Sequence, residues 1–245
     1  MNINSTANLY LKDVSILKKY GDRYKLTLVR TMRQKGVEIN KKRVMGVNDD
    51  KLDNNISRAK QRIFEYSMCN DFEYFITLTI SPDKYDRTNL QNYYKHFRTF
   101  IKNYNRLKNT KIEYVFIPEM HKDGCWHLHG LIKGILKDDI FINENGYLDW
   151  RSYKERFGWV SMSVIRNRHK TSSYMTKYVS KSMSKTVAEL GAHTYYASKG
   201  LKVAEIMKKG SLLELPNEYD FSNDYVKIKW FDDDSISCLI QELNR

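Results

Sequence analysis

The sequence predicts an α+β protein in which a central antiparallel sheet is flanked by helices. Strand-like and helix-like segments alternate irregularly, and two strand-like segments in the middle of the chain are separated by a short turn that is typical of a hairpin. This arrangement favours an antiparallel sheet over the regular strand–helix repeats of a parallel one. With 245 residues, of which 41% are hydrophobic, the chain can build a sizeable core.

Composition divides the chain into a basic N-terminal extension (1–53), a central domain (54–202) and an acidic C-terminal tail (203–245). Residues 211–245 hold eight acids and three bases, a local charge of −5, so the net +13 of the whole chain leaves +18 on residues 1–210. Such an excess favours a polyanionic partner, and nucleic acid before a membrane surface. The alternative is a basic surface that serves only solubility.

Neither a membrane segment nor a disulfide framework is expected. No uninterrupted apolar run of about 18 residues is present, and the N-terminus lacks the regions of a signal peptide. Cys69, Cys125 and Cys238 are scattered and form no CxxC pair, so a cysteine zinc site is not indicated either. We therefore expect a protein of a reducing, cytoplasmic compartment without a membrane partner.

Local patterns place the first elements. The run YKLTLVR (24–30) indicates a strand within the N-terminal extension, and a helix is expected from Asn55, after which apolar residues recur at helical spacing. The β-branched and aromatic run YFITLTI (74–80) predicts a buried strand. Thr88 is expected to cap a second helix. The apolar face of that helix consists of Leu90, Tyr93, Tyr94, Phe97, Phe100, Ile101 and Tyr104.

The remaining elements follow from the same patterns. A helix with threonine and serine at its start is expected over 171–185, and a capped helix over 232–243. Further strands are expected at EYVFIPEM (113–120), CWHLHGLI (125–132), WVSMSVI (159–165), HTYYAS (193–198) and YVKIKWF (225–231).

The hairpin segment EMHKDGCWHLHG (119–130) holds three of the six histidines of the chain. Because side chains alternate along a strand, His127 and His129 lie on one face of it. With a two-residue loop, Glu119 would lie opposite Leu128, on the other face. A three-residue loop that ends in Gly124 pairs Glu119 with His127 instead, and it places glycine in the left-handed conformation that this turn requires.

In the three-residue register Glu119, His127 and His129 converge, and His121 lies on the same face one step nearer the turn. Two imidazoles and a carboxylate leave coordination positions open for water and substrate. Such a site suits Mn²⁺ or Mg²⁺ as a Lewis acid, and it would also suit Zn²⁺. The alternative is a pair of surface histidines without a metal ion.

The predicted helix over 171–185 has two separate arcs. At about 100° per residue, one arc is apolar and supplies core residues, while the other holds Tyr174, Lys177, Tyr178 and Lys181. A nearby ammonium group stabilises a phenolate, so these tyrosines are candidate nucleophiles. The preceding RNRHK adds charge that can bind phosphate. An aromatic core stripe is the alternative.

Three motifs together resemble those of the HUH endonucleases of rolling-circle replication. They are FITLT (75–79), HLHG (127–130) and YMTKYVSK (174–181), and their order and spacing also agree. The resemblance covers about 54–202 and is greatest to the replication initiators (Rep) of small single-stranded DNA phages and related plasmids. It implies a ferredoxin-like or RRM-like α+β domain with a central antiparallel sheet.

The resemblance also implies the chemistry of a metal-dependent tyrosine DNA endonuclease and strand transferase. A divalent cation, Mn²⁺ or Mg²⁺, held by His127, His129 and Glu119 would polarise the scissile phosphate of single-stranded origin DNA. A tyrosine would attack and become joined to the DNA 5′ end, and the freed 3′-OH would prime synthesis.

Within this family, some single-tyrosine plasmid initiators keep the position of Tyr178 and have glutamate at the position of Tyr174. Tyr178 is therefore the first candidate nucleophile and Tyr174 the second. Lys181 or Lys177 would stabilise the phenolate or the phosphate charge.

No GxxxxGK[ST] phosphate loop is present in the sequence, which predicts a separate helicase and polymerase, supplied in the cytoplasm of a bacterial host. Other functions stay open at this point. An HUH transposase or a mobilisation relaxase would use the same chemistry on other DNA. A basic DNA-binding module with a structural metal would form no covalent adduct, and a metallohydrolase would cut without either tyrosine.

Overall fold

The computed structural model describes residues 8–35, 49–179, 193–210, 217–233 and 235–236. The chain forms two compact units. One spans Val47–Val203, and the other combines the two ends of the chain, Met1–Gly46 and Ala204–Arg245. Each unit contains an antiparallel sheet, which confirms the predicted α+β class with a sheet flanked by helices.

The unit Val47–Val203 is built on a seven-stranded antiparallel sheet with the strand order β6-β7-β8-β3-β5-β4-β9. The strands predicted near 74–80, 113–120, 125–132 and 159–165 are confirmed, and β6 and β7 are additional. Their bounds are β3 Tyr74–Ile80, β4 Glu113–Met120, β5 Trp126–Lys133, β6 Ile140–Ile142, β7 Leu148–Trp150, β8 Gly158–Val164 and β9 Tyr196–Ala197.

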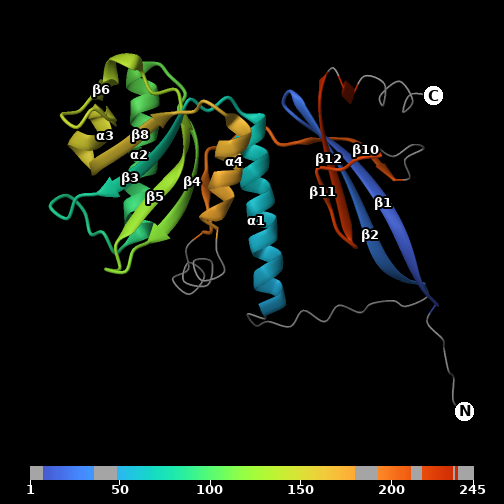
Figure 1. Ribbon diagram of the computed structural model, residues 1–245. Helices are drawn as coiled ribbons and strands as arrows, with labels where there is room; N and C mark the ends of the chain where they lie inside the picture. The colour runs from blue at the N-terminus through green and yellow to red at the C-terminus, as the bar shows by residue number, and fades with distance from the viewer. Residues whose placement is uncertain (1–7, 36–48, 180–192, 211–216, 234, 237–245) are drawn as a thin grey trace, which may run out of the picture. The chain divides into compact units, whose positions relative to one another are not determined.

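Helix α2 (Leu90–Lys108) covers one face of this sheet (Figure 1). It forms because its apolar residues recur every three or four positions, and Leu90, Tyr93, Phe97, Ile101 and Tyr104 are all buried. They pack on the inward residues of β3, Ile76, Leu78 and Ile80. This aromatic core makes the sheet a rigid support for the residues on its other face.

The cap of α2 differs from the prediction. Asn89, rather than Thr88, is the N-cap, and its side chain accepts a hydrogen bond of 3.0 Å from the Asn92 N–H. The Thr88 hydroxyl donates to Asp86 instead, at 2.6 Å. An Asx side chain at this position satisfies a free N–H of the first turn as well as threonine would.

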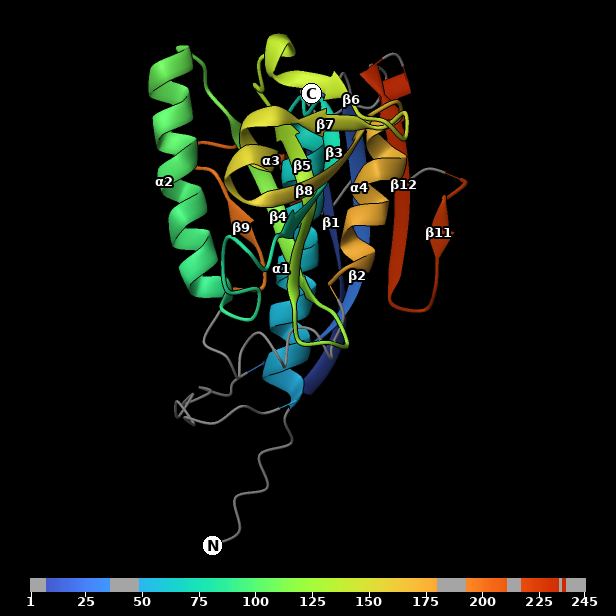
Figure 2. The ribbon, with the colours of Figure 1, turned by 90° about the vertical axis from the view of Figure 1, so that its left-hand side faces the viewer.

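Helices α1 (Asp49–Cys69) and α4 (Arg168–Lys177) pack on the opposite face of the sheet (Figure 2). They share a second buried core with strands β4 and β5. Its residues are Ile56, Ala59, Ile63, Phe72, Val115, Ile117, Leu131, Met175 and Val179. This core holds α4 against the face on which the histidines of β5 lie.

The start of α4 was predicted too late. The helix begins at Arg168 rather than at 171, because the side chain of Asn167 accepts a hydrogen bond of 2.9 Å from the Lys170 N–H and so caps the helix. Residues 180–185 of the predicted helix lie outside the described residues. Two further short helical turns are α3 (Arg151–Arg156) and the 3₁₀ turn Lys137–Asp139.

The ends of the chain form a five-stranded sheet with the order β10-β1-β2-β12-β11. The strands predicted at 24–30 and 225–231 are confirmed within it, whereas β1 was not predicted. The bounds are β1 Asn8–Tyr20, β2 Arg23–Lys35, β10 Glu205–Gly210, β11 Phe221–Ser222 and β12 Val226–Asp232. Most of the helix predicted over 232–243 lies outside the described residues. Among the helices that the structure describes, none combines the length and apolar character that a membrane-spanning segment needs.

Candidate active site

The β4–β5 hairpin has the register that brings its acidic and imidazole side chains together. Glu119 pairs with His127, and Ile117 pairs with His129. Directly opposite residues of an antiparallel pair point to the same side of the sheet. Glu119, His127 and His129 therefore lie on one face, as the three-residue loop predicted.

The loop itself explains this register. The His121 N–H donates to the Cys125 carbonyl at 2.9 Å, and the Gly124 N–H donates to the His121 carbonyl at 3.0 Å. Gly124 has a φ of +78°, a conformation that side-chain-bearing residues rarely adopt. The glycine thus allows the three-residue turn and, through it, the pairing of the two strands.

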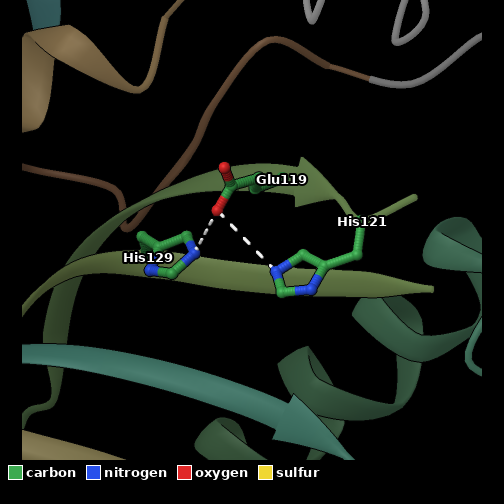
Figure 3. A group of neighbouring side chains, drawn as sticks. All are labelled: Glu119, His121 and His129. Carbon is green, nitrogen blue, oxygen red and sulfur yellow. Dashed lines mark ion pairs between the residues drawn. The ribbon is translucent and has the colours of Figure 1, made fainter. Parts of the chain in front are cut away.

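Three potential ligand groups lie together at this hairpin (Figure 3). A carboxylate oxygen of Glu119 is 2.6 Å from Nε2 of His129 and 4.0 Å from Nε2 of His121. One ligand atom from each residue lies within 4.8 Å of the others. This is a possible cation-binding cluster in which two predicted ligands, Glu119 and His129, are joined by His121.

His127 lies beside this cluster rather than within it. Its ring stacks on the His121 ring, with a centroid distance of 3.8 Å and an interplanar angle of 4°. The His129 ring is nearly parallel to it, at 6.4 Å. A small rotation of side chains would therefore decide which imidazoles complete a site with Glu119.

Two threonines of β3 orient the two histidines of β5. The hydroxyl of Thr77 is 3.0 Å from Nδ1 of His129, and the hydroxyl of Thr79 is 3.1 Å from Nδ1 of His127. With Nδ1 engaged, each ring keeps Nε2 as the remaining donor to a cation, and such outer partners are typical of metal-binding histidines. The threonines were not singled out from the sequence, although their alternation in FITLTI places them on one face.

Removing these hydroxyl groups should weaken cation binding. We expect Thr77→Val and Thr79→Val each to lower the affinity for Mn²⁺ by about 10- to 100-fold, because the imidazoles lose the partner that fixes their orientation. Titration calorimetry would measure the affinity. Ser161→Ala is a matched control, since Ser161 lies opposite Thr77 on β8. Unchanged affinity in both threonine variants would show that the hydroxyls do not orient ligands.

Both histidines are neutral at neutral pH. Burial and the neighbouring imidazoles lower the pKa of His127 to about 4. Burial also lowers the pKa of His129, although the Glu119 carboxylate opposes this. Nε2 of His129 is shielded from solvent, and the carboxylate is its close polar neighbour. Neutral imidazoles next to a carboxylate are the form that binds a divalent cation without first losing a proton.

These pKa values predict a pH dependence of stability for the metal-free protein. Below the ordinary imidazole pKa of about 6.5 the unfolded chain binds a proton at His127 that the folded chain refuses, so stability falls as pH drops from 6.5 toward 4. In EDTA, we expect the decrease in Tm between pH 7 and pH 4.5 to be larger for the native chain than for His127→Asn. Equal decreases would contradict the low pKa.

The tyrosines of α4 lie directly above this cluster. The Tyr178 ring stacks on the His129 ring at a centroid distance of 4.5 Å and an angle of 13°. The hydroxyl groups of Tyr174 and Tyr178 are 2.8 Å apart. Phe75 of β3 contacts both rings. The two hydroxyl groups are thus neighbours, one helical turn apart, as their four-residue spacing predicted.

The phenol of Tyr178 is protonated in this environment. Burial, the hydrogen bond with Tyr174 and the negative charge of Glu119 all raise its pKa above the usual value. Lys177 is exposed next to it, and Lys181 lies outside the described residues. A phenolate at Tyr178 therefore needs added positive charge, such as a cation at the neighbouring ligands.

Comparison with known proteins places the site within a family match. Residues 73–183 match the family model of the replication-associated protein ORF2, a family of the Rep type. No curated protein and no solved structure matches the chain. The matched segment begins just before β3 and contains the histidine hairpin and both tyrosines of α4. Over the segment that holds the whole candidate site, the chain is similar to replication-associated proteins.

Proposed function

We propose that this protein is a replication initiator that nicks single-stranded origin DNA and rejoins it through a 5′-phosphotyrosine intermediate, starting rolling-circle replication. One observation carries the proposal: the Tyr178 ring stacks on His129, whose Nε2 lies 2.6 Å from the Glu119 carboxylate. A tyrosine and a set of cation ligands therefore occupy one surface. The similarity to replication-associated proteins supports the biological setting.

His127, His129 and Glu119 would hold the cation, Mn²⁺ or Mg²⁺. When bound, it would act as a Lewis acid on the scissile phosphate. Two neutral imidazoles with anchored Nδ1 atoms and one carboxylate suit such an ion, and the imidazoles favour Mn²⁺ over Mg²⁺, which prefers oxygen ligands. We place His127 rather than His121 in this set because only His127 has a threonine partner on its Nδ1 among the residues that the structure describes.

In the proposed reaction the phenolic oxygen of Tyr178 attacks phosphorus, and the bond between phosphorus and the 3′ oxygen of the preceding nucleotide breaks. The phenol loses its proton and the leaving 3′ oxygen gains one, so the strand ends in a free 3′-OH and a phosphotyrosine. Lys177 and Lys181 would balance phosphate charge. The diester bond is conserved, so attack by a 3′-OH on the phosphotyrosine rejoins a strand.

The second tyrosine would allow a second cut while the first remains joined to DNA. The hydroxyl groups lie 2.8 Å apart, so a small movement of α4 would exchange them at one phosphate. After a full circle has been copied, Tyr174 would cut the regenerated origin, and the released strand would be closed. Unwinding and synthesis would come from a separate helicase and polymerase of the bacterial host.

A covalent adduct would test this function. The protein is incubated with overlapping single strands that cover the DNA flanking its gene, with Mn²⁺ or with EDTA, and then run on a denaturing gel. We expect one strand to be cut only with Mn²⁺, with its 3′-labelled fragment in the protein band and its 5′-labelled fragment free.

Other outcomes would point to the alternative functions. Binding without any adduct would favour a DNA-binding module with a structural metal, and cutting without an adduct would favour hydrolysis by a metal-bound water. Adducts only with a transposon-end hairpin or a transfer origin would assign the same chemistry to a transposase or a relaxase.

A further inference from the structure

The outer face of β8 is open along its whole length. Val160 and Met162 point into the core, whereas Trp159, Ser161 and Ser163 alternate with them and are exposed. Trp159 is 52% exposed, which is unusual for the largest apolar side chain. Among the described residues its indole has no aromatic ring or cation stacked on it, so its π-face is available to a ligand.

This face is continuous with the candidate active site. Trp159 pairs with Thr79 of β3, and Thr79 pairs with His127 of β5, so the three side chains form one row on the same side of the sheet. Two strand spacings separate the indole row position from His127, a distance of about 10 Å. Trp159 therefore lies about one nucleotide away from the proposed scissile phosphate.

At the other end of β8 the same face opens into a pocket of about 580 Å³. It lies between the end of β8 and α4, beside the candidate nucleophiles. Aromatic, hydroxyl and cationic groups line it, including Phe75, Ser163, Lys170, Thr171, Tyr174 and Lys177. A flat apolar ring with surrounding hydroxyl groups suits a nucleobase, and the lysines suit the phosphate next to it.

We propose that the outer face of β8 is a binding strip for single-stranded DNA, in which Trp159 stacks on a base on one side of the cut phosphate and the pocket beside Tyr174 holds a base on the other side. The strip, defined by Trp159, Ser161, Ser163 and the pocket, is about 13 Å long over four residue steps. Its polar composition, with hydroxyls between aromatic ends, fits an unpaired strand rather than an apolar protein surface. The identity of the cut phosphate rests on the proposed function, whereas binding of the strand does not.

Binding in EDTA separates the strip from the chemistry. A fluorescent oligo-dT strand is titrated with the full chain, and anisotropy gives Kd without cleavage. We expect Trp159→Ala to weaken binding about tenfold and Trp159→Phe by less than about threefold, because phenylalanine can still stack on a base. Tyr147→Ala is the matched control. Tyr147 is an exposed aromatic residue of the same unit, in the turn between β6 and β7, and its loss should leave Kd unchanged.

The pocket is tested by a second pair of variants. Ser163→Glu places a carboxylate at its mouth and should weaken binding about tenfold, whereas the neutral Ser163→Gln should change Kd by less than about threefold. Native Kd values in both Trp159→Ala and Ser163→Glu would overturn the strip, even if the covalent adduct forms. Equal affinity and equal losses with oligo-U would overturn its assignment to DNA. Conversely, the expected losses in a chain that forms no adduct would uphold the strip and refute the nicking function.

Discussion

Replacing Tyr174 and Tyr178 together with phenylalanine is expected to abolish the covalent protein–DNA adduct. The double variant keeps both rings, and therefore the contacts with Phe75 and the stacking on His129, but it removes both nucleophilic oxygens. Loss of the nucleophile should lower the nicking rate by about 1,000-fold or more. The rate is measured with labelled single-stranded origin DNA and Mn²⁺ on a denaturing gel.

The two single variants should behave differently. Tyr178→Phe should remove most of the first cleavage, because Tyr178 is the tyrosine stacked on His129. Tyr174→Phe should still nick in a single turnover but turn over poorly, since no second hydroxyl remains for the second cut. Tyr147→Phe, an exposed tyrosine away from α4, serves as the control. Normal multiple turnover by Tyr174→Phe would reduce the enzyme to a single-tyrosine mechanism.

The second large effect concerns the histidines of β5. We expect His127→Ala and His129→Ala each to lower the rate of cleavage by about 1,000-fold while the affinity for single-stranded DNA changes little. Contacts between cationic side chains and phosphates dominate DNA affinity, so loss of a metal ligand leaves binding largely intact. Glu119→Ala should have a smaller effect, because water can fill an open coordination position.

His121 is the discriminating control for this assignment. Its ring lies 4.0 Å from the Glu119 carboxylate, yet no threonine partner for its Nδ1 is found among the described residues, and its side chain is about half exposed. We therefore expect His121→Ala to retain cleavage within about tenfold of the native rate. Loss of cleavage in His121→Ala with retention in His127→Ala would replace His127 by His121 in the ligand set.

The sequence predicted the hairpin well because one residue controls it. A glycine at position 124 makes the three-residue loop favourable, and the loop length sets the pairing of every residue that follows. Once Glu119 is paired with His127, alternation along the strands decides which side chains meet. The same local logic predicted β3 and the apolar face of α2.

Other features depend on contacts between distant parts of the chain. Thr77 and His129 are 52 residues apart, and nothing in either local pattern shows that β3 and β5 are neighbours. The choice between His121 and His127 rests on side-chain rotation, which a strand pattern does not specify. Likewise, Ser15 of β1 pairs with Gly210 of β10, so the segments expected as an extension and a tail contribute to one sheet.

The most direct test of the central claim is the chemical identity of the residue joined to DNA. Trypsin should separate the two candidates, because Tyr174 lies in Thr171–Lys177 and Tyr178 begins the peptide that ends at Lys181. After nuclease digestion of the adduct, mass spectrometry should find a nucleotide on the Tyr178 peptide, with a smaller amount on the Tyr174 peptide. A nucleotide on any other residue, or cleaved DNA with no modified peptide, would contradict catalysis by these tyrosines.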